Sequence, residues 1–239
     1  EYCYWHKKEE GKEPDDAQLR ELKENKILEV FLRKAWLKEK ELQNAFLPFA
    51  DLQGAVLSHA DLQGAFFSDA KLQGAVLWDA DLQRANLSSA KLQGADLSSA
   101  NLQGADLSYA NLQGAVLSGN LQGADLRSAN LQGADLRGAN LEGANLSGVR
   151  VDSGTRLDEA KLTYANLYHS YLDETKTLRN AKFESEKEIN KIVADFLKRR
   201  NKDLAILDVE KIVKDDYYFK ACARKFLEEF VRHDSNKAR

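Results

Sequence analysis

A period of five residues governs the middle of this chain and constrains its fold more than any other feature. From Ala45 to Val151 the sequence forms 22 consecutive pentads, whose central residue is Leu in 20 cases and Phe67 or Val151 in the others. The residue two before the centre is Ala in 20 pentads, and Gly119 or Val149 in the remaining two. Neither a helix of 3.6 residues per turn nor a strand of alternating residues brings every Leu and Ala to one core. A chain that turns a corner every five residues does.

Four sides of five residues make one coil, and stacked coils bury Leu and Ala along one continuous interior. A large residue alternating with a small one fills such a narrow interior without voids. This accounts for a sequence that is 43% hydrophobic but only 9% aromatic. The pentads resemble those of the pentapeptide-repeat family, and this resemblance implies a right-handed quadrilateral β-helix.

A second period, of ten residues, places Leu-Gln-Gly-Ala on two opposite sides of the coil. We therefore expect Gln53, Gln73, Gln93 and Gln113 to stack in one ladder at roughly the ~4.8 Å spacing of strands. Amide side chains in such a ladder can hydrogen-bond along the stack.

The pentad register slips at a few points. Leu117 and Leu121 are one residue too close, so either Gly119 makes a tightened corner or a residue is missing from the sequence. Val151 and Leu157 are one residue too far apart, and Ser153-Gly154 has the turn chemistry to loop out the extra residue. Weaker pentads continue to Phe183.

The two ends of the chain change composition, as expected of caps that cover the terminal coils of a solenoid. The sequence predicts an N-terminal segment, 1–44, with a helix over 15–41. A β-helix over 45–183, most regular over 45–151, follows it. A C-terminal helical cap, 184–239, begins with a capping-box pattern at Ser185 and ends with a helix over about 209–231. The predicted fold class is thus an all-β solenoid with α-helical caps at both termini. The alternative for the apolar helical stripes is a surface that binds a partner or another copy.

Residues suited to catalysis or metal binding form no recognisable motif. The histidines and cysteines lie far apart and show no ligand spacing: His6, His59, His169, His233, Cys3 and Cys222. Glycines recur as corner residues of the repeat and not in a phosphate loop. The sequence therefore predicts no enzyme, no cofactor and no metal site. Two isolated cysteines suggest a reducing compartment, and we expect a cytoplasmic protein.

The repeats are acidic but not uniformly so. Residues 45–175 carry 15 acidic and 8 basic residues. In the pentapeptide-repeat family, the members that confer quinolone resistance are thought to resemble DNA and to bind DNA gyrase through acidic rows. The corresponding candidate surface here is Asp51, Asp61, Asp81, Asp96 and Asp106. Asn, Lys and Arg interrupt its rows, whereas DNA mimicry needs continuous negative charge. The net charge of −3 also argues against direct binding of nucleic acid.

Apolar residues occupy outward positions in the first pentads. The candidate contact surface consists of Phe46, Val56, Phe66, Val76 and Trp78. Outward aromatic and branched residues mark either a partner site or the seat of a docked helix, and the helix predicted over 15–41 favours docking.

The segment from Tyr2 to Lys8 is aromatic and then basic, like the cytoplasmic flank of a membrane helix. One interpretation is a membrane anchor upstream of residue 1; the other is a terminus whose aromatic side chains pack locally. The sequence as a whole predicts a non-catalytic scaffold that binds an unidentified protein partner or forms a homodimer through its terminal helices. The alternative is an acidic, DNA-like protein that binds DNA gyrase or another topoisomerase.

Overall fold

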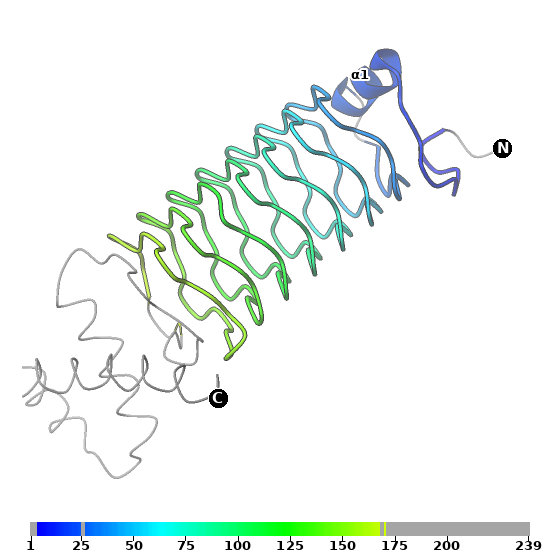
Figure 1. The fold of residues 1–239 in the computed structure, drawn as a ribbon. Coiled ribbons are helices and arrows are strands. Elements are labelled where there is room, and N and C mark those ends of the chain that lie inside the picture. Colours follow the sequence, from blue (N-terminus) through cyan, green and yellow to red (C-terminus); the bar gives the residue numbers. More distant parts are fainter. Residues whose placement is uncertain (1–3, 25–26, 168–169, 171–239) are drawn as a thin grey trace, which may run out of the picture.

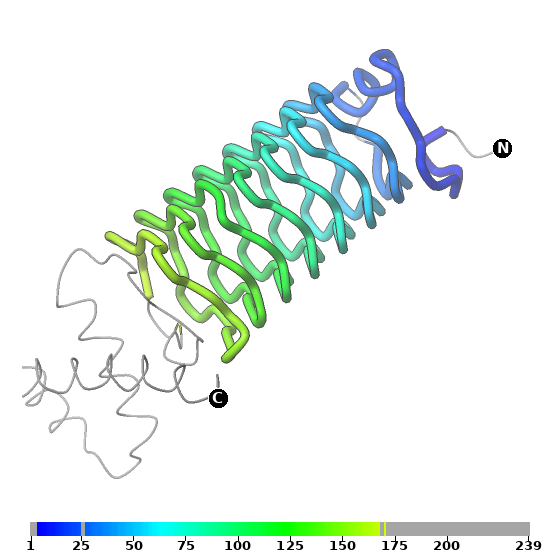
Figure 2. The backbone as a smooth tube through the Cα atoms, in the orientation of Figure 1, coloured from blue at the N-terminus to red at the C-terminus, as the bar shows by residue number. Residues whose placement is uncertain are grey.

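The computed structural model describes residues 4–24, 27–167 and Ser170. These residues form an elongated rod of stacked four-sided coils, with the helix α1, Asp16–Glu24, at its N-terminal end (Figure 1). The coils run along the rod in chain order (Figure 2). The predicted C-terminal cap, 184–239, and the pentads beyond Ser170 lie outside the described residues. Within the described residues, no helix has the length and apolar character needed to cross a bilayer.

Each side of the coil contributes one parallel β-bridge to the next coil, at the residue before each central Leu, and in the described residues these bridges stay isolated. The bridges pair residues 20 apart, as from Phe31 to Asp51 and from Trp36 to Val56, and residues 19 or 21 apart where a register slip lies between them. They define four columns that run along the rod. Side 1 contains Phe31, Asp51, Lys71, Lys91, Asn111, Asn130 and Arg150. Side 2 contains Trp36, Val56, Val76, Asp96, Val116, Asp135 and Arg156. Side 3 contains Glu41, Asp61, Asp81, Asn101, Asn120, Asn140 and Lys161. Side 4 contains Phe46, Phe66, Asn86, Asp106, Asp125, Asn145 and Asn166.

The interior of the rod is the predicted stack of Leu and Ala. Every Leu and Ala at the two inward positions of the pentads from Leu32 to Leu146 is at most 1% exposed, and so is Phe67. At the corners, the second residue after the centre adopts a positive φ, whether it is Gly, as in Gly54 at 65°, or not, as in His59 at 57°. Apart from the two register slips, at Gly119 and at Ser153-Gly154, the corners therefore use the left-handed conformation that Gly adopts without cost.

The β-helix begins earlier than predicted, and the helix predicted over 15–41 is wrong beyond Glu24. Bridges already join Phe31, Trp36 and Glu41 to the next coil. Leu32, Leu37 and Leu42 continue the five-residue spacing, and each of them is buried. Their Lys- and Glu-rich neighbours have good helix propensity, but the backbone hydrogen bonds and core of the next coil outweigh it. The boundary predicted at residue 45 therefore falls inside the coils.

Residues 4–24, here called the N-terminal cap, close the first coil. Trp5 and Leu22 are fully buried and Leu19 is 4% exposed, so the cap extends the core by large side chains. The indole Nε1 of Trp5 donates a hydrogen bond to Glu21 in α1 at 2.8 Å. The aromatic residues near the N-terminus, Tyr4 and Trp5, thus pack locally, with their ring centroids 4.9 Å apart.

Candidate functional site

Exposed apolar side chains lie on two opposite sides of the rod near its N-terminal end. Side 4 carries Phe66, which is 44% exposed, and Phe49, which follows Phe46 and is 51% exposed; the second group lies on side 2. Trp36, Val56 and Val76 occupy successive coils in one column. Trp78 follows Val76 by two residues and lies at the neighbouring corner. Trp36 is 50% exposed and Trp78 is 40% exposed. These four residues are called the tryptophan patch below.

Trp78 is held in place by the coil before it. Its ring meets that of His59 edge-on, with the centroids 4.1 Å apart. His59 Nδ1 lies 2.9 Å from Oδ2 of Asp79, the residue after Trp78. This pair joins the two coils beside the patch, so Trp78 is presented in a defined orientation. An anchored aromatic side chain loses little conformational freedom on binding.

Trp36 is absent from the predicted contact surface, because it falls inside the helix predicted over 15–41. The signal that could have found it is the pentad Ala35-Trp36-Leu37, which repeats Ala55-Val56-Leu57 one coil earlier. The five-residue period therefore identifies Trp36 once the period is extended upstream.

The predicted contact surface is divided between two opposite sides of the rod. Val56, Val76 and Trp78 belong to the tryptophan patch, whereas Phe46 and Phe66 lie on side 4. The ring centroids of Phe46 and Phe66 are 6.0 Å apart, and Phe66 is 44% exposed. The division follows from the geometry, because ten residues correspond to half of a four-sided coil.

The docked helix predicted to cover these residues is confined to the end of the rod. α1 contacts Phe46 through its backbone, since the Leu22 carbonyl accepts a hydrogen bond from the Phe46 N–H at 3.3 Å. Phe66 and the two tryptophans keep the exposure given above. Docking of this helix therefore does not account for the outward apolar residues as a group.

The predicted acidic surface is dispersed over all four sides. Asp51 lies on side 1, Asp96 on side 2, Asp61 and Asp81 on side 3, and Asp106 on side 4. In each of the five, Oδ1 accepts a hydrogen bond from the backbone N–H two residues later, at 2.9–3.4 Å. These carboxylates therefore fix the backbone at the start of the corners, a role that Asn also performs.

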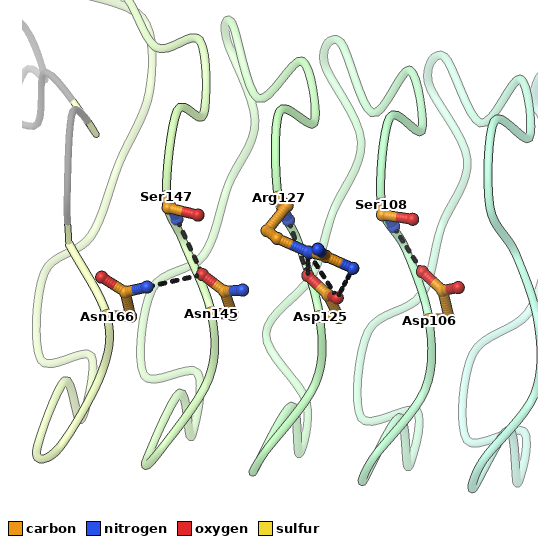
Figure 3. Close-up of polar contacts among 7 residues, drawn as sticks. All are labelled: Asp106, Ser108, Asp125, Arg127, Asn145, Ser147 and Asn166. Carbon is orange, nitrogen blue, oxygen red and sulfur yellow. Dashed lines mark hydrogen bonds and ion pairs between the residues drawn. The ribbon is translucent and has the colours of Figure 1, made fainter.

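Later carboxylates are neutralised by arginines of their own pentads. The Arg127 Nε donates to both carboxylate oxygens of Asp125, at 2.8 and 3.0 Å (Figure 3). On side 2, Arg137 binds Asp135 in the same way, and its hydrogen bond holds the pKa of that carboxyl below its usual range. Figure 3 shows Asn145 in the same column as Asp125 and accepting the equivalent backbone bond. Negative charge is therefore interrupted along each column.

Amide side chains hydrogen-bond from coil to coil, most continuously along side 3 and with single Asn–Asn bonds on sides 1 and 4. Asn140 Nδ2 donates to Asn120 at 3.1 Å, and Asn120 Nδ2 donates to Asn101 at 3.2 Å, along side 3. On side 1 the predicted hydrogen bonds along the glutamine stack are absent at Gln73 and Gln93, whose buried Oε1 atoms have no partner. On side 3, glutamines also reach the next coil: Gln63 Nε2 donates to Asp81 at 2.9 Å and Gln103 Nε2 donates to Gln122 at 3.3 Å.

Within residues 4–24 and 27–167, no group of three or more His, Cys, Asp or Glu side chains could hold a metal ion. What these described residues present is a surface with exposed aromatic groups on sides 2 and 4, columns of amides and scattered carboxylates. Such a surface is suited to contact with another macromolecule.

Comparison with known proteins agrees with the coil geometry. A family model described as pentapeptide repeats matches residues 41–79, 50–88, 80–119 and 120–152. HetL, a pentapeptide-repeat protein involved in regulation of heterocyst differentiation in the cyanobacterium Nostoc, is 32% identical, over 62% of this chain and 82% of HetL, with a TM-score of 0.34. Another pentapeptide-repeat protein of Nostoc is 39% identical, over 45% of this chain and 73% of its own, with a TM-score of 0.24.

A trypsin-treated form of QnrB1, a plasmid-mediated fluoroquinolone resistance protein, is 20% identical over 78% of this chain and 93% of its own, with a TM-score of 0.51. This likeness shows a shared fold, the right-handed β-helix. No match was found among curated protein sequences. The pentads matched by the family model, and the identity with HetL over most of that protein, show that this chain belongs to the pentapeptide-repeat family.

Proposed function

We propose that the chain is a non-catalytic scaffold whose β-helix binds a protein partner through the tryptophan patch. The observation that carries this proposal is the column Trp36–Val56–Val76 with Trp78 beside it, whose exposed ring is held against His59. Tryptophan side chains in contact regions contribute more binding energy than most residues, because they bury a large area with few rotatable bonds.

The core favours a rigid scaffold over a mobile one. Leu and Ala fill the interior without exposed members, and each coil is bonded to the next on all four sides. A surface on such a rod is preorganised, so binding costs little ordering of the scaffold. We place this scaffold in the cytoplasm, as the two isolated cysteines suggest.

The experiment compares two pairs of exposed aromatic residues. Trp36→Ser with Trp78→Ser removes the patch, and Tyr109→Ser with Tyr164→Ser removes aromatic side chains that are 66% and 62% exposed elsewhere. Each form is used for affinity capture from the source cells with quantitative mass spectrometry. We expect one partner to be retained by the parent and by the tyrosine variant, and to fall at least about tenfold with the tryptophan variant. Equal capture by both variants would contradict the proposal.

A second candidate is binding to DNA gyrase or another topoisomerase. The β-helix that this chain shares with the fluoroquinolone resistance protein QnrB1 favours it. The dispersed carboxylates, each bonded to its own corner, favour it less than a continuous acidic column would. A gyrase supercoiling assay with titrated protein tests this candidate, and unchanged supercoiling at micromolar protein would remove it.

A homodimer through the terminal helices stays a prediction. The apolar residues of α1, Leu19 and Leu22, are buried within their own chain. A dimer contact of this kind would therefore rest on 184–239, which lie outside the described residues.

A further inference from the structure

The N-terminal cap is bonded to the first coil as if it were a coil itself. Three backbone N–H groups of the first coil donate to carbonyl oxygens of the cap: Phe31 to Trp5 at 2.7 Å, Trp36 to Lys12 at 2.9 Å and Phe46 to Leu22 at 3.3 Å. One coil later the same positions donate to inward residues of the first coil: Asp51 to Val30, Val56 to Ala35 and Phe66 to Ala45, at 2.8–2.9 Å. The cap thus supplies carbonyl acceptors where a preceding coil would supply them. Trp5 corresponds to Val30 of the first coil, Lys12 to Ala35, and Leu22 to Ala45.

A corner of a coil is also reproduced. Gly11 adopts a φ of 69° and its N–H donates to the Arg33 carbonyl at 2.9 Å. The equivalent residue in the first coil, Lys34, adopts a φ of 53° and donates to Gln53 at 2.9 Å. The cap therefore satisfies the edge of the β-helix by imitating one coil on three of its sides.

The cap is joined to the first coil by fewer backbone hydrogen bonds than a neighbouring coil is. Apart from the turn bond from Ala50 to Leu47, twelve backbone hydrogen bonds join residues 30–49 to residues 50–69, whereas four join the described cap residues to 30–49. The cap also buries the Lys12 side chain, which is 5% exposed and donates to the carbonyl oxygens of Tyr4 and Phe31. Burying an ammonium group carries a desolvation cost that the Ala of a regular coil does not have. Segments with few backbone bonds open at lower free energy than the core.

The cap covers the N-terminal strand edge of the β-helix. Without the cap, the bridge residues of the first coil would offer free N–H and carbonyl groups around all four sides of the rod, the arrangement that recruits other chains. A single extended peptide could pair with one side only. A second β-helix with the same cross-section matches all four, and two identical edges pair through a two-fold axis.

We propose that the N-terminal cap is a displaceable substitute for a coil. In place, it closes the N-terminal edge of the β-helix; when lifted, it turns that edge into a docking surface for the same edge of a second copy of this chain. The edge includes the backbone N–H of Trp36, so the end-on contact adjoins the tryptophan patch, whose side chains lie on the outside of the coils.

Amide hydrogen exchange of the unmodified chain, followed by NMR, tests whether the cap is displaceable. We expect the N–H groups of Phe31, Trp36 and Phe46 to exchange at least about tenfold faster than those of Asp51, Val56 and Phe66. The first set is bonded to the cap and the second set to a coil. Equal protection of the two sets would overturn the proposal.

Light scattering coupled to gel filtration tests the docking surface in the full chain. Trp5→Asp with Leu22→Asp places two charges beneath the cap and opens it, and Leu28→Asp is the matched control at a residue that is 52% exposed. We expect the opened variant to have twice the molar mass of the parent, and the control to keep the mass of the parent. If the double variant fails to fold, Lys12→Ala serves the same comparison, because it removes the bonds from Nζ to Tyr4 and Phe31.

Adding Phe31→Pro to the opened variant separates edge pairing from association of exposed apolar surface. Proline removes an N–H of the edge and leaves the tryptophan patch intact. We expect it to weaken the dimer at least about tenfold. An opened and folded variant that keeps the mass of the parent overturns the proposal, and so does a mass increase that Phe31→Pro leaves unchanged.

Discussion

At the scale of single residues, Gly119 shows how the β-helix absorbs a missing residue. It occupies an inward position that is Ala in most pentads, and a Cβ there would lie 2.2 Å from the Ala100 carbonyl oxygen. That same oxygen accepts the Asn120 N–H at 3.0 Å, and the Gly119 carbonyl accepts the Asn140 N–H at 3.0 Å. The coil thus closes with one residue fewer, because the absent Cβ lets the backbone approach its neighbour. Of the two explanations that the sequence left open, the structure supports the tightened corner.

Substitution of Gly119 tests this explanation. Gly119→Ala should destabilise the protein by about 3 kcal/mol, since neither the neighbouring backbone nor the new Cβ can move aside. Gly74→Ala is the control, because a Cβ at Gly74 meets nothing within 4 Å and only the φ of 63° opposes it. The control should cost roughly 1–2 kcal/mol. Urea unfolding followed by circular dichroism measures both, and equal losses would contradict the steric explanation.

At the scale of an element, the six-residue spacing between Val151 and Leu157 is accommodated by a specific corner. Asp152 Oδ1 accepts hydrogen bonds from the N–H groups of Gly133 and Gly154 at 2.9 and 2.8 Å. Thr155 takes the inward Ala position, is fully buried, and donates from Oγ1 to the Leu131 carbonyl at 2.9 Å. The extra residue is therefore looped out as the sequence predicted, and the Asp and Thr side chains satisfy the backbone that it exposes.

This corner predicts a pH dependence. Burial by itself would raise the pKa of Asp152, but hydrogen bonds from Gly133, Gly154 and Thr155 hold that pKa below its ordinary value of 3.8. A depressed pKa stabilises the folded state above the unfolded pKa, and this contribution disappears as the pH falls through the folded pKa. Asp152→Asn should therefore cost about 1 kcal/mol near neutral pH, and the difference from the parent should shrink in acid. A difference in urea midpoint that stays constant from neutral pH into acid would count against this assignment.

The ends of the β-helix show where sequence patterns compete. Residues 30–44 carry helix-forming Lys and Glu beside Leu32, Leu37 and Leu42, and both a helix and a pentad account for part of that pattern. The next coil decides between them, because its N–H and carbonyl groups need partners at Phe31, Trp36 and Glu41. The helix propensity of residues 30–44 is therefore outweighed by hydrogen bonds to the next coil. These partners lie outside the segment, so its own sequence does not reveal them.

At the scale of the whole molecule, each coil contacts only its neighbours, so the length of the rod is adjustable. Deleting residues 90–109 removes one coil and returns every later residue to the same side. We expect this variant to fold with the parent's β signal in circular dichroism and to be shorter by about 4.8 Å. Small-angle X-ray scattering measures the length. Loss of the β signal would show that distant coils depend on one another.

The sequence alone determined the cross-section of this protein. A Leu and an Ala in nearly every pentad leave no regular helix or strand that could bury both. A coil with a corner every five residues, its core and its outward positions follow from spacing, and the resemblance to the pentapeptide-repeat family implies four sides. The sequence also placed Val56, Val76 and Trp78 at a surface. It joined them wrongly to Phe46 and Phe66, since adjacency on the outside depends on the number of sides between two residues.

Only the tertiary structure decided where the coils begin, which outward residues share a side, and how the first edge is closed. Trp5, Lys12 and Leu22 have no common spacing and no pentad pattern, yet their carbonyl oxygens accept from three sides of the same coil. A repeat specifies its own interior because every unit repeats the same contacts. Its ends have no next unit, so irregular residues satisfy them through contacts that become apparent only in the folded chain.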